Sequence, residues 1–282
     1  MKNELYKYAF PNEAGVVSVK GGFCAALFTI AIFGLLNQIL TVIGPPRIIV
    51  HRAKNQEELW KWKNLLLSWI HALIIGIWDL SCFYLYPEMW QDLINHISPF
   101  TYYMVAISTG YFFYDFMDLL IQGKLLKEWE LSLHHIAVIS TFVYNLSNRM
   151  FIGYTAVALL TEVNSIFLHL RKLMQMLRVS FTAPVYRLNA LINLATFLLC
   201  RGYCLARITY GIVAERSRID TAYLCLLGGA MCIMNLINPA LFVILLRSDV
   251  FRRSRRLSNT VGHGSDPGAD KTDDGENNGK LY

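Results

Sequence analysis

The sequence predicts an all-α fold, a polytopic membrane helix bundle of about seven transmembrane helices. Hydrophobic residues make up 55% of the 282 residues, charged residues only 16%, and the mean hydropathy is +0.38. A soluble domain of this size needs more charge to cover its surface. The apolar residues also come in blocks of about twenty, the length that a helix needs to cross about 30 Å of hydrocarbon.

Each predicted span is an apolar block with polar residues on both sides. The first begins only near Gly21 and is longer than the apolar region of a cleavable signal peptide, so we expect it to be retained. The fourth is short and carries two histidines, so we expect it to pack inside the bundle. In chain order the spans cover residues 21–43, 64–86, 101–121, 131–147, 151–170, 188–213 and 221–246.

The chain divides into three predicted parts. Residues 1–56 hold an N-terminal segment with the first span, 57–250 form a domain of six spans, and 251–282 are a basic-then-acidic tail. The tail has too few apolar residues to order its backbone, so we expect it to be disordered. Its first arginines predict contact with anionic lipid, and Ser258 is a predicted phosphorylation site that would weaken this contact. The interpretation that we favour for these arginines is a simple positive-inside anchor, because short basic sites are common.

The distribution of Lys and Arg predicts the orientation. Basic residues gather in the loops after the first, third and fifth spans and after the last span, whereas the 87–100 loop has none. This bias predicts an N-terminus outside and a C-terminus in the cytosol. Because these residues lie in short loops and not on one amphipathic face, the net charge of +6 does not indicate a nucleic-acid partner.

Two further patterns argue against covalent features. All six cysteines fall inside apolar blocks, where they behave as small buried side chains, so we expect neither disulfides nor a metal site. The sequence Asn145-Leu146-Ser147 matches a glycosylation sequon, but it lies at the end of a span and close to the bilayer. We therefore expect this sequon to be unused.

Ionisable side chains inside the spans are the main candidates for function, because each costs at least a few kcal/mol in a bilayer. Asp115 and Asp118 share a helix face, and we expect them to hold a proton between them or to recruit a cation such as Arg201. His134 and His135 lie about 100° apart around the helix axis, so only one faces the bundle centre. The other polar residues of this set are His71, Asp79, Glu162, Ser165, His169 and Arg207.

Two explanations of this set compete. The first is an acid–base or nucleophilic site for lipid chemistry, in which His134 and His135 react and Glu162 orients an imidazole. The second is interhelical hydrogen bonding that fixes the helix register. Spacing alone leaves both open.

The run Lys127-Glu128-Trp129-Glu130-Leu131-Ser132-Leu133-His134-His135-Ile136 resembles the tandem-His segment of the TLC-domain superfamily, which includes the ceramide synthases. The likeness is greatest to the TLC-domain-containing proteins 1 and 2 and covers about residues 57–250. Ceramide synthases carry His-Asp-x-x-Asp on the next helix, where this chain has Thr161-Glu162-Val163-Asn164-Ser165. One acid of that motif is therefore kept, and the His and the second Asp are replaced. The other segments that carry the likeness are Trp60-Lys61-Trp62-Lys63-Asn64, Gly110-Tyr111-Phe112 with Asp115 and Asp118, and Leu245-Leu246-Arg247-Ser248-Asp249.

The resemblance implies control of membrane phospholipid composition and fluidity at the plasma membrane. Such a protein limits the incorporation of polyunsaturated acyl chains and so favours a more rigid bilayer, without a cofactor. The expected ligand is a phospholipid or an acyl chain, and the expected lipid-binding polar cluster consists of His71, Asp79, Asp115, Asp118, Ser165, His169 and Arg201.

Two other functions compete with this one. The alternative is a His-dependent acyltransferase that uses acyl-CoA as substrate and acts on a sphingoid base or lysophospholipid, and the alternative location is the endoplasmic reticulum. Its catalytic residues would be His134, His135 and Glu162. A transporter is disfavoured, because the sequence has neither an inverted repeat nor paired spans broken by Gly or Pro.

Overall fold

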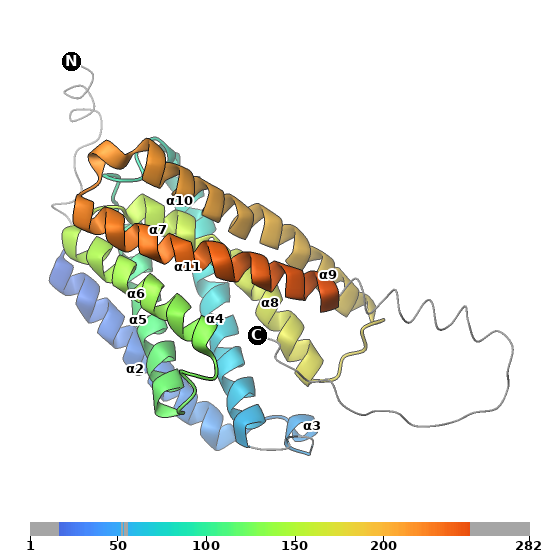
Figure 1. The fold of residues 1–282 in the computed structure, drawn as a ribbon. Helices are drawn as coiled ribbons and strands as arrows, with labels where there is room; N and C mark the ends of the chain where they lie inside the picture. The colour runs from blue at the N-terminus through green and yellow to red at the C-terminus, as the bar shows by residue number, and fades with distance from the viewer. Residues whose placement is uncertain (1–16, 52, 54–55, 249–282) are drawn as a thin grey trace, which may run out of the picture. The chain divides into compact units, whose positions relative to one another are not determined.

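The fold is helical throughout the part of the chain that the computed structural model describes, which is residues 17–51, 53 and 56–248. No strand occurs among these residues. The predicted basic tail, including Ser258, lies outside the described residues. The elements in chain order (Figure 1) are α2 (Val19–Ile43), α3 (Arg47–Val50), α4 (Gln56–Leu85), η2 (Pro87–Trp90), α5 (Pro99–Ile121), α6 (Trp129–Asn148), α7 (Ile152–Leu159), α8 (Thr161–Met176), α9 (Pro184–Thr196), η3 (Phe197–Gly202), α10 (Tyr203–Ala214), η4 (Arg216–Arg218) and α11 (Thr221–Leu246).

Five helical segments are long and apolar enough to cross a membrane: α2, α4, α5, the run from α9 through α10, and α11. They confirm a multi-pass helical membrane protein. The other two predicted spans are also helical, but they do not meet the same test of length and composition. The fourth forms α6, and the fifth is divided at Leu160 into α7 and α8. The count of seven crossings therefore stays a prediction.

Local sequence signals set several helix ends. The Ser18 hydroxyl accepts a hydrogen bond from the backbone N–H of Gly21 and so caps α2. Ser98 and Thr101 form a reciprocal capping box at the start of α5, with Pro99 in its first turn. Gly44 ends α2 at φ 73°, a conformation that glycine adopts without steric cost.

By their contacts, residues 1–234 and 235–282 form two units, and the packing that positions the site lies within the first. In that unit α2 packs chiefly against α5, α4 against α8, and α5 against α6 (Figure 1). Gly110 allows the closest of these approaches, because a Cβ atom there would lie 2.8 Å from the Ala26 Cα. Small residues let helix backbones approach closely. In lipid this close van der Waals packing drives helix association, because there is no hydrophobic driving force between helices.

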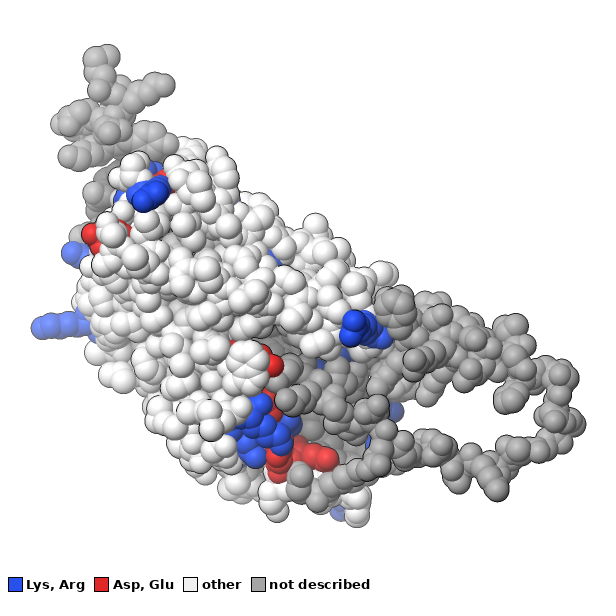
Figure 2. All heavy atoms as spheres, viewed as in Figure 1, with Lys and Arg blue, Asp and Glu red and all other residues white. Residues whose placement is uncertain are grey.

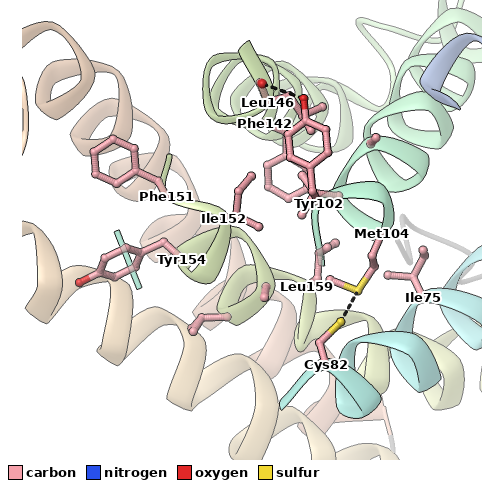
Figure 3. Packing of buried hydrophobic residues seen from close by; sticks show 14 of the residues in the cluster. Ile75, Cys82, Tyr102, Met104, Phe142, Leu146, Phe151, Ile152, Tyr154 and Leu159 are labelled. Atoms are coloured by element: carbon pink, nitrogen blue, oxygen red, sulfur yellow. Dashed lines mark hydrogen bonds between the residues drawn. The ribbon is translucent and has the colours of Figure 1, made fainter. Parts of the chain in front are cut away.

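The apolar core surrounds α7, the short helix in the middle of the bundle (Figure 3). Ile152 and Leu159 are almost fully buried between residues of α4, α5 and α6. Two polar contacts cross this core. The Tyr102 hydroxyl donates to the Leu146 carbonyl oxygen at 3.0 Å, and the Cys82 Sγ lies 3.6 Å from the Met104 Sδ (Figure 3).

Most of the face shown in Figure 2 carries no charged side chain. The Lys, Arg, Asp and Glu side chains gather toward its ends. At one end Lys124 and Lys127 of the α5–α6 loop both pair with Glu57 of α4. At the other end Arg218 donates two hydrogen bonds, of 2.9 and 3.0 Å, to Asp92. Each group of ion pairs joins loops that the sequence predicts to lie on the same side of the membrane.

The Asp92–Arg218 contact predicts a modest pH-dependent stability. Burial opposes ionisation of Asp92, but the hydrogen bonds from Asn95 and Arg218 outweigh it and hold the pKa of the carboxyl below its usual 3.8. A carboxyl with a depressed pKa stabilises the fold above its unfolded pKa and loses this contribution as the pH falls through its folded pKa. We expect Asp92→Asn to cost about 1 kcal/mol or less at pH 7, since Arg218 is partly exposed.

Thermal unfolding of the purified protein between pH 3 and pH 7 measures this difference. The wild type and the Asp92→Asn variant should converge toward the acid end of the range. A constant difference across the range would show that the ion pair does not cause it.

Candidate functional site

The most connected polar group in the bundle is the His135–Asp115 pair, which joins α6 to α5. The His135 Nε2 lies 2.9 Å from the Asp115 Oδ2, and both side chains are nearly fully buried. The other ring nitrogen, Nδ1, lies 2.8 Å from the Leu131 carbonyl oxygen. Asn64 of α4 donates to the remaining oxygen of Asp115. Every polar atom of this pair therefore has a partner.

These contacts fix the protons of the pair. A carbonyl oxygen only accepts, so the Nδ1 of His135 must carry a proton and donate it to Leu131. A second proton then lies between Nε2 and Asp115, as an imidazolium facing a carboxylate or as an imidazole facing a carboxylic acid. Both forms have no net charge, which suits a buried position.

Asp118 is held at the α4 end of the same network. Its Oδ2 accepts from the Trp60 indole N–H at 2.7 Å and, more weakly, from Asn64 at 3.4 Å. Asn64 thus bridges the two aspartates that the sequence places on one helix face. We expected the two aspartates to share a proton or to recruit a cation such as Arg201. The partner that the structure gives Asp115 is His135, because α6 packs on α5.

His71 forms the next polar layer along α4. Its Nε2 lies 3.1 Å from the Ser108 hydroxyl, and its ring stacks on Tyr111 with centroids 3.8 Å apart. The Nδ1 faces the Glu162 Oε2 at 3.8 Å, an ion-pair distance and not a hydrogen bond. We expected Glu162 to orient an imidazole, and the imidazole that it faces at ion-pair distance is that of His71.

Glu162 and Arg201 both lie where helices depart from regular geometry. Glu162 follows the α7–α8 junction at Leu160, and Arg201 belongs to η3, a π-helical segment. The Arg201 guanidinium donates to the Asn164 side-chain oxygen at 2.7 Å and to the Ser165 hydroxyl at 3.0 Å. Broken and π-helical segments inside membrane bundles occur where backbone or side chains serve a site.

His134 and His169 are the accessible histidines of the cluster. Both are partly exposed, whereas His135 and His71 are buried. The Nδ1 of His134 lies 3.3 Å from the Met234 Sδ, a weak acceptor, and its ring is set at 84° to that of His135. Among the described residues no side chain or backbone group hydrogen-bonds the Nε2 of His134 or either ring nitrogen of His169. These nitrogens are therefore available to a ligand.

Two predicted residues, Asp79 and Arg207, make no hydrogen bond with the other members of this cluster in the described part of the chain. Asp79 of α4 is completely buried. Arg207 of α10 donates to the Tyr154 hydroxyl at 3.0 Å and lies 3.6 Å from Glu215, so it joins helices near the end of the bundle. The structure therefore supports a role for Arg207 in packing.

The charged groups also have neutral hydrogen-bond partners, for which the sequence predicts no role. Asn64, Ser108 and Asn164 each contact a member of the cluster. Asn164 also donates to the Asn193 side chain at 2.9 Å and is completely buried. The sequence feature that could have identified Asn64 and Asn164 is a side-chain amide inside an apolar helix, because a buried amide also needs a hydrogen-bond partner.

The structure also describes the six cysteines, the sequon and the surroundings of the metal-ligating residue types. All six cysteines are free thiols. Asn145 of the sequon is 2% exposed and donates to the Thr155 hydroxyl, so a glycosylating enzyme cannot reach it in this fold. Among residues 17–51, 53 and 56–248, no group of three or more His, Cys, Asp or Glu side chains is placed to hold a metal ion.

Fold and site together define a multi-pass helical membrane protein with an ionisable cluster inside its bundle, in which His135 of the tandem pair and His71 each face a carboxylate on a neighbouring helix. The chain belongs to the TLC-domain family, whose domain matches residues 61–247. This range holds every residue of the cluster.

Similar proteins agree with this assignment. TLC domain-containing protein 2 of Danio rerio is 39% identical over 200 residues, which are 71% of this chain and 81% of that protein. TLC domain-containing protein 2 of Homo sapiens is 32% identical over 208 residues, 73% of this chain and 77% of that protein. TLC domain-containing protein 1 of Homo sapiens is 30% identical over 200 residues, 71% of this chain and 80% of that protein. No solved structure matches the chain.

Proposed function

We propose that this protein regulates membrane phospholipid composition and fluidity by limiting the incorporation of polyunsaturated acyl chains into phospholipids. It acts by holding a phospholipid or an acyl chain in the polar cluster inside the bundle. The observation that carries the proposal is the pair of partly exposed imidazoles, His134 and His169, in the same bundle as the buried Glu162 and the partly exposed Arg201. Charged groups inside a membrane bundle are typical of ligand or ion pathways, because burying a charged side chain in the bilayer costs at least a few kcal/mol.

The replaced acid supports binding over catalysis. Where the ceramide synthases have their second Asp, this chain has Ser165, whose hydroxyl accepts from Arg201. Asp115 is likewise engaged on both oxygens, by His135 and Asn64. A general base must be within reach of its proton and free to take it, and neither carboxylate meets His134. In the proposed arrangement no cofactor takes part.

We place the protein in the plasma membrane with its N-terminus outside and its C-terminus in the cytosol. The distribution of Lys and Arg supports this orientation, and the contacts of Lys124 and Lys127 with Glu57 join the first and third loops at one end. In the same proposal the basic tail contacts anionic lipid. The endoplasmic reticulum is the alternative location.

Deletion of the gene tests the proposal. Cells without the protein should accumulate more polyunsaturated phosphatidylethanolamine when fed a polyunsaturated fatty acid, and expression of the wild-type chain should reverse this change. Quantitative lipidomics measures both effects. An unchanged phospholipid profile under this feeding would contradict the proposal.

A second candidate function is an acyl-CoA-dependent acyltransferase. One observation favours it: the Nε2 of His134, a predicted catalytic residue, has no hydrogen-bond partner among the described residues. Purified protein given labelled acyl-CoA with a lysophospholipid or a sphingoid base separates the two candidates. We expect no labelled product. Turnover that is lost in His134→Ala and His135→Ala would favour the enzyme.

A further inference from the structure

Three imidazole nitrogens of the cluster have no hydrogen-bond partner among the described residues and are not covered by protein. They are the Nε2 of His134 on α6 and both ring nitrogens of His169 on α8. Both residues are partly exposed. None of the three atoms belongs to the buried side-chain nitrogens that lack a partner in the described part of the chain. The nitrogens themselves, and not only the ring carbons, can therefore be reached by a ligand.

The two accessible histidines flank the same buried pair. The His134 ring centroid lies 5.5 Å from that of His135, and His169 interacts electrostatically with Asp115. Arg201 interacts electrostatically with both His134 and His169. In the chain of helix contacts α6 packs on α5, α5 on α4 and α4 on α8, whereas α6 and α8 do not pack directly on each other (Figure 1). The two imidazoles therefore reach one region of the bundle from helices that do not close on each other.

The charges around these histidines favour an acidic ligand. Two cations, Arg201 and Lys172, interact electrostatically with His169. One carboxyl, that of Glu162, interacts with Arg201, and the His135–Asp115 pair has no net charge. An opposite charge nearby stabilises the ionised form of a group, and a like charge opposes it. The region therefore disfavours an amine, such as that of a sphingoid base, and favours a group that becomes an anion.

His134 is arranged to accept a proton from such a ligand. Its Nδ1 lies 3.3 Å from the Met234 Sδ, and a thioether sulfur only accepts, so this contact requires the tautomer with its proton on Nδ1. The Nε2 of His134 then carries a lone pair. The next residue shows the same arrangement with a partner in place: the Nδ1 of His135 donates to a carbonyl oxygen, and its Nε2 shares a proton with Asp115.

A lipid carboxyl has the atoms that this arrangement requires. As a neutral acid it enters a bilayer without the cost of a charge, and it brings the proton that the Nε2 of His134 accepts. An ester has no such proton. A phospholipid phosphate stays charged and belongs at the interface, whereas Arg201 lies near the middle both of the apolar run Pro184–Ala214 and of the predicted span 188–213. The carboxyl of an unesterified fatty acid therefore fits better than a phospholipid headgroup.

We infer that His134, together with His169 and Arg201, binds the carboxyl group of an unesterified fatty acid. The carboxyl proton is shared with the Nε2 of His134, and no covalent bond forms between ligand and protein. The inference rests on the proposed function and names its ligand class. A polyunsaturated fatty acid held here is withheld from activation to a thioester, the class of reaction that must precede its incorporation into a phospholipid.

Three lipids with the same acyl chain test the site on the purified full-length protein. Unlabelled linoleic acid, methyl linoleate and linoleoyl lysophosphatidylethanolamine each compete with radiolabelled linoleic acid in a scintillation proximity assay. We expect the acid to compete at least about tenfold more strongly than the other two, because the ester lacks the proton and the anionic form, and the lysophospholipid carries its charge on a phosphate.

Variants link this preference to the imidazoles. His134→Ala should weaken binding of the acid at least about tenfold and leave binding of the ester unchanged, and His169→Ala should act in the same direction. Both variants should keep the wild-type melting temperature, because the one printed partner of the His134 ring is a weak sulfur acceptor. His51→Ala is the matched control, since His51 is an exposed imidazole at the end of α3.

Equal competition by the acid and the ester on the wild type would overturn the inference, and so would a preference for the acid that is unchanged in His134→Ala. Strongest competition by the lysophospholipid would overturn it as well, in favour of a phosphate ligand. If His134→Ala does not fold, His134→Phe, which keeps a ring, takes its place. None of these results alters the lipidomic change on gene deletion, so failure of this site and failure of the proposed function are distinguishable.

Discussion

Asp115→Ala should destabilise the protein by about 3–5 kcal/mol, the largest loss we expect from a single side chain. The substitution removes the partner of the His135 Nε2 and of the Asn64 amide, both of which stay inside the bundle. Breaking a buried pair costs far more than the net worth of its attraction, because the remaining group is left without compensation. Thermal unfolding of the purified protein in detergent measures the loss.

Two controls separate this effect from a simple change of volume. Asp115→Asn retains groups that hydrogen-bond both His135 and Asn64, so we expect it to lose less than half as much stability as Asp115→Ala. The double variant Asp115→Ala/His135→Ala should be less destabilised than the sum of its single variants, by at least about 1 kcal/mol. A loss below about 1 kcal/mol for Asp115→Ala alone would mean that the pair does not hold α5 to α6.

Gly110→Leu should be nearly as damaging, for a purely steric reason. A Cβ atom at this position would contact the backbone of Ala26, and backbone cannot move aside as a flexible side chain can. Overpacking of a close contact costs about 1–3 kcal/mol and more where the backbone must shift, so we expect at least about 3 kcal/mol here. The melting temperature should fall, because α2 loses its main contact with the rest of the unit.

A glycine on the facing helix provides the matched control. A Cβ atom at Gly34 of α2 would meet nothing within 4 Å. Gly34→Ala should therefore leave stability unchanged or raise it by up to about 1 kcal/mol, since alanine favours the helix. Similar melting temperatures for Gly110→Leu and Gly34→Ala would contradict the close approach of α2 and α5.

Much of the fold was accessible from the sequence, because the bilayer imposes helix length and apolar composition. All seven predicted spans are helical, with boundaries within a few residues for five of them; α4 begins well before its predicted span, and α8 extends past the predicted end of the fifth. The α7–α8 junction was not predictable in this way. It falls at Leu159-Leu160-Thr161, where neither Gly nor Pro interrupts the apolar run, and the Thr161 hydroxyl donates to the Ala158 carbonyl oxygen at 2.8 Å beside the break.

The site was predictable in its members and not in its pairings. The spacing rule placed Asp115 and Asp118 on one face and set His134 and His135 in different directions, and both statements hold in the structure. Spacing within a helix carries no information on which helices are neighbours. It therefore could not tell that α6 brings His135 to Asp115, where a shared proton or a cation such as Arg201 was expected. Nor could it tell that α4 brings His71 to Glu162.

The distinction between buried and accessible histidines also comes from packing. His135 and His71 have fixed partners, and we interpret them as residues that hold the helices in register. His134 and His169 keep open nitrogens, and we interpret them as residues that face a ligand. Adjacent positions in the sequence, His134 and His135, thus carry different proposed roles.

The central claim is that the polar cluster serves lipid composition and not only helix packing. Lipidomic rescue of cells that lack the protein, with Glu162→Gln and Arg201→Gln each expressed and folded at the wild-type level, tests it most directly. Glu88→Gln, the same exchange in the loop after α4, is the control. We predict that the wild type and the control lower polyunsaturated phosphatidylethanolamine while both cluster variants do not, and full rescue by both cluster variants would contradict the claim.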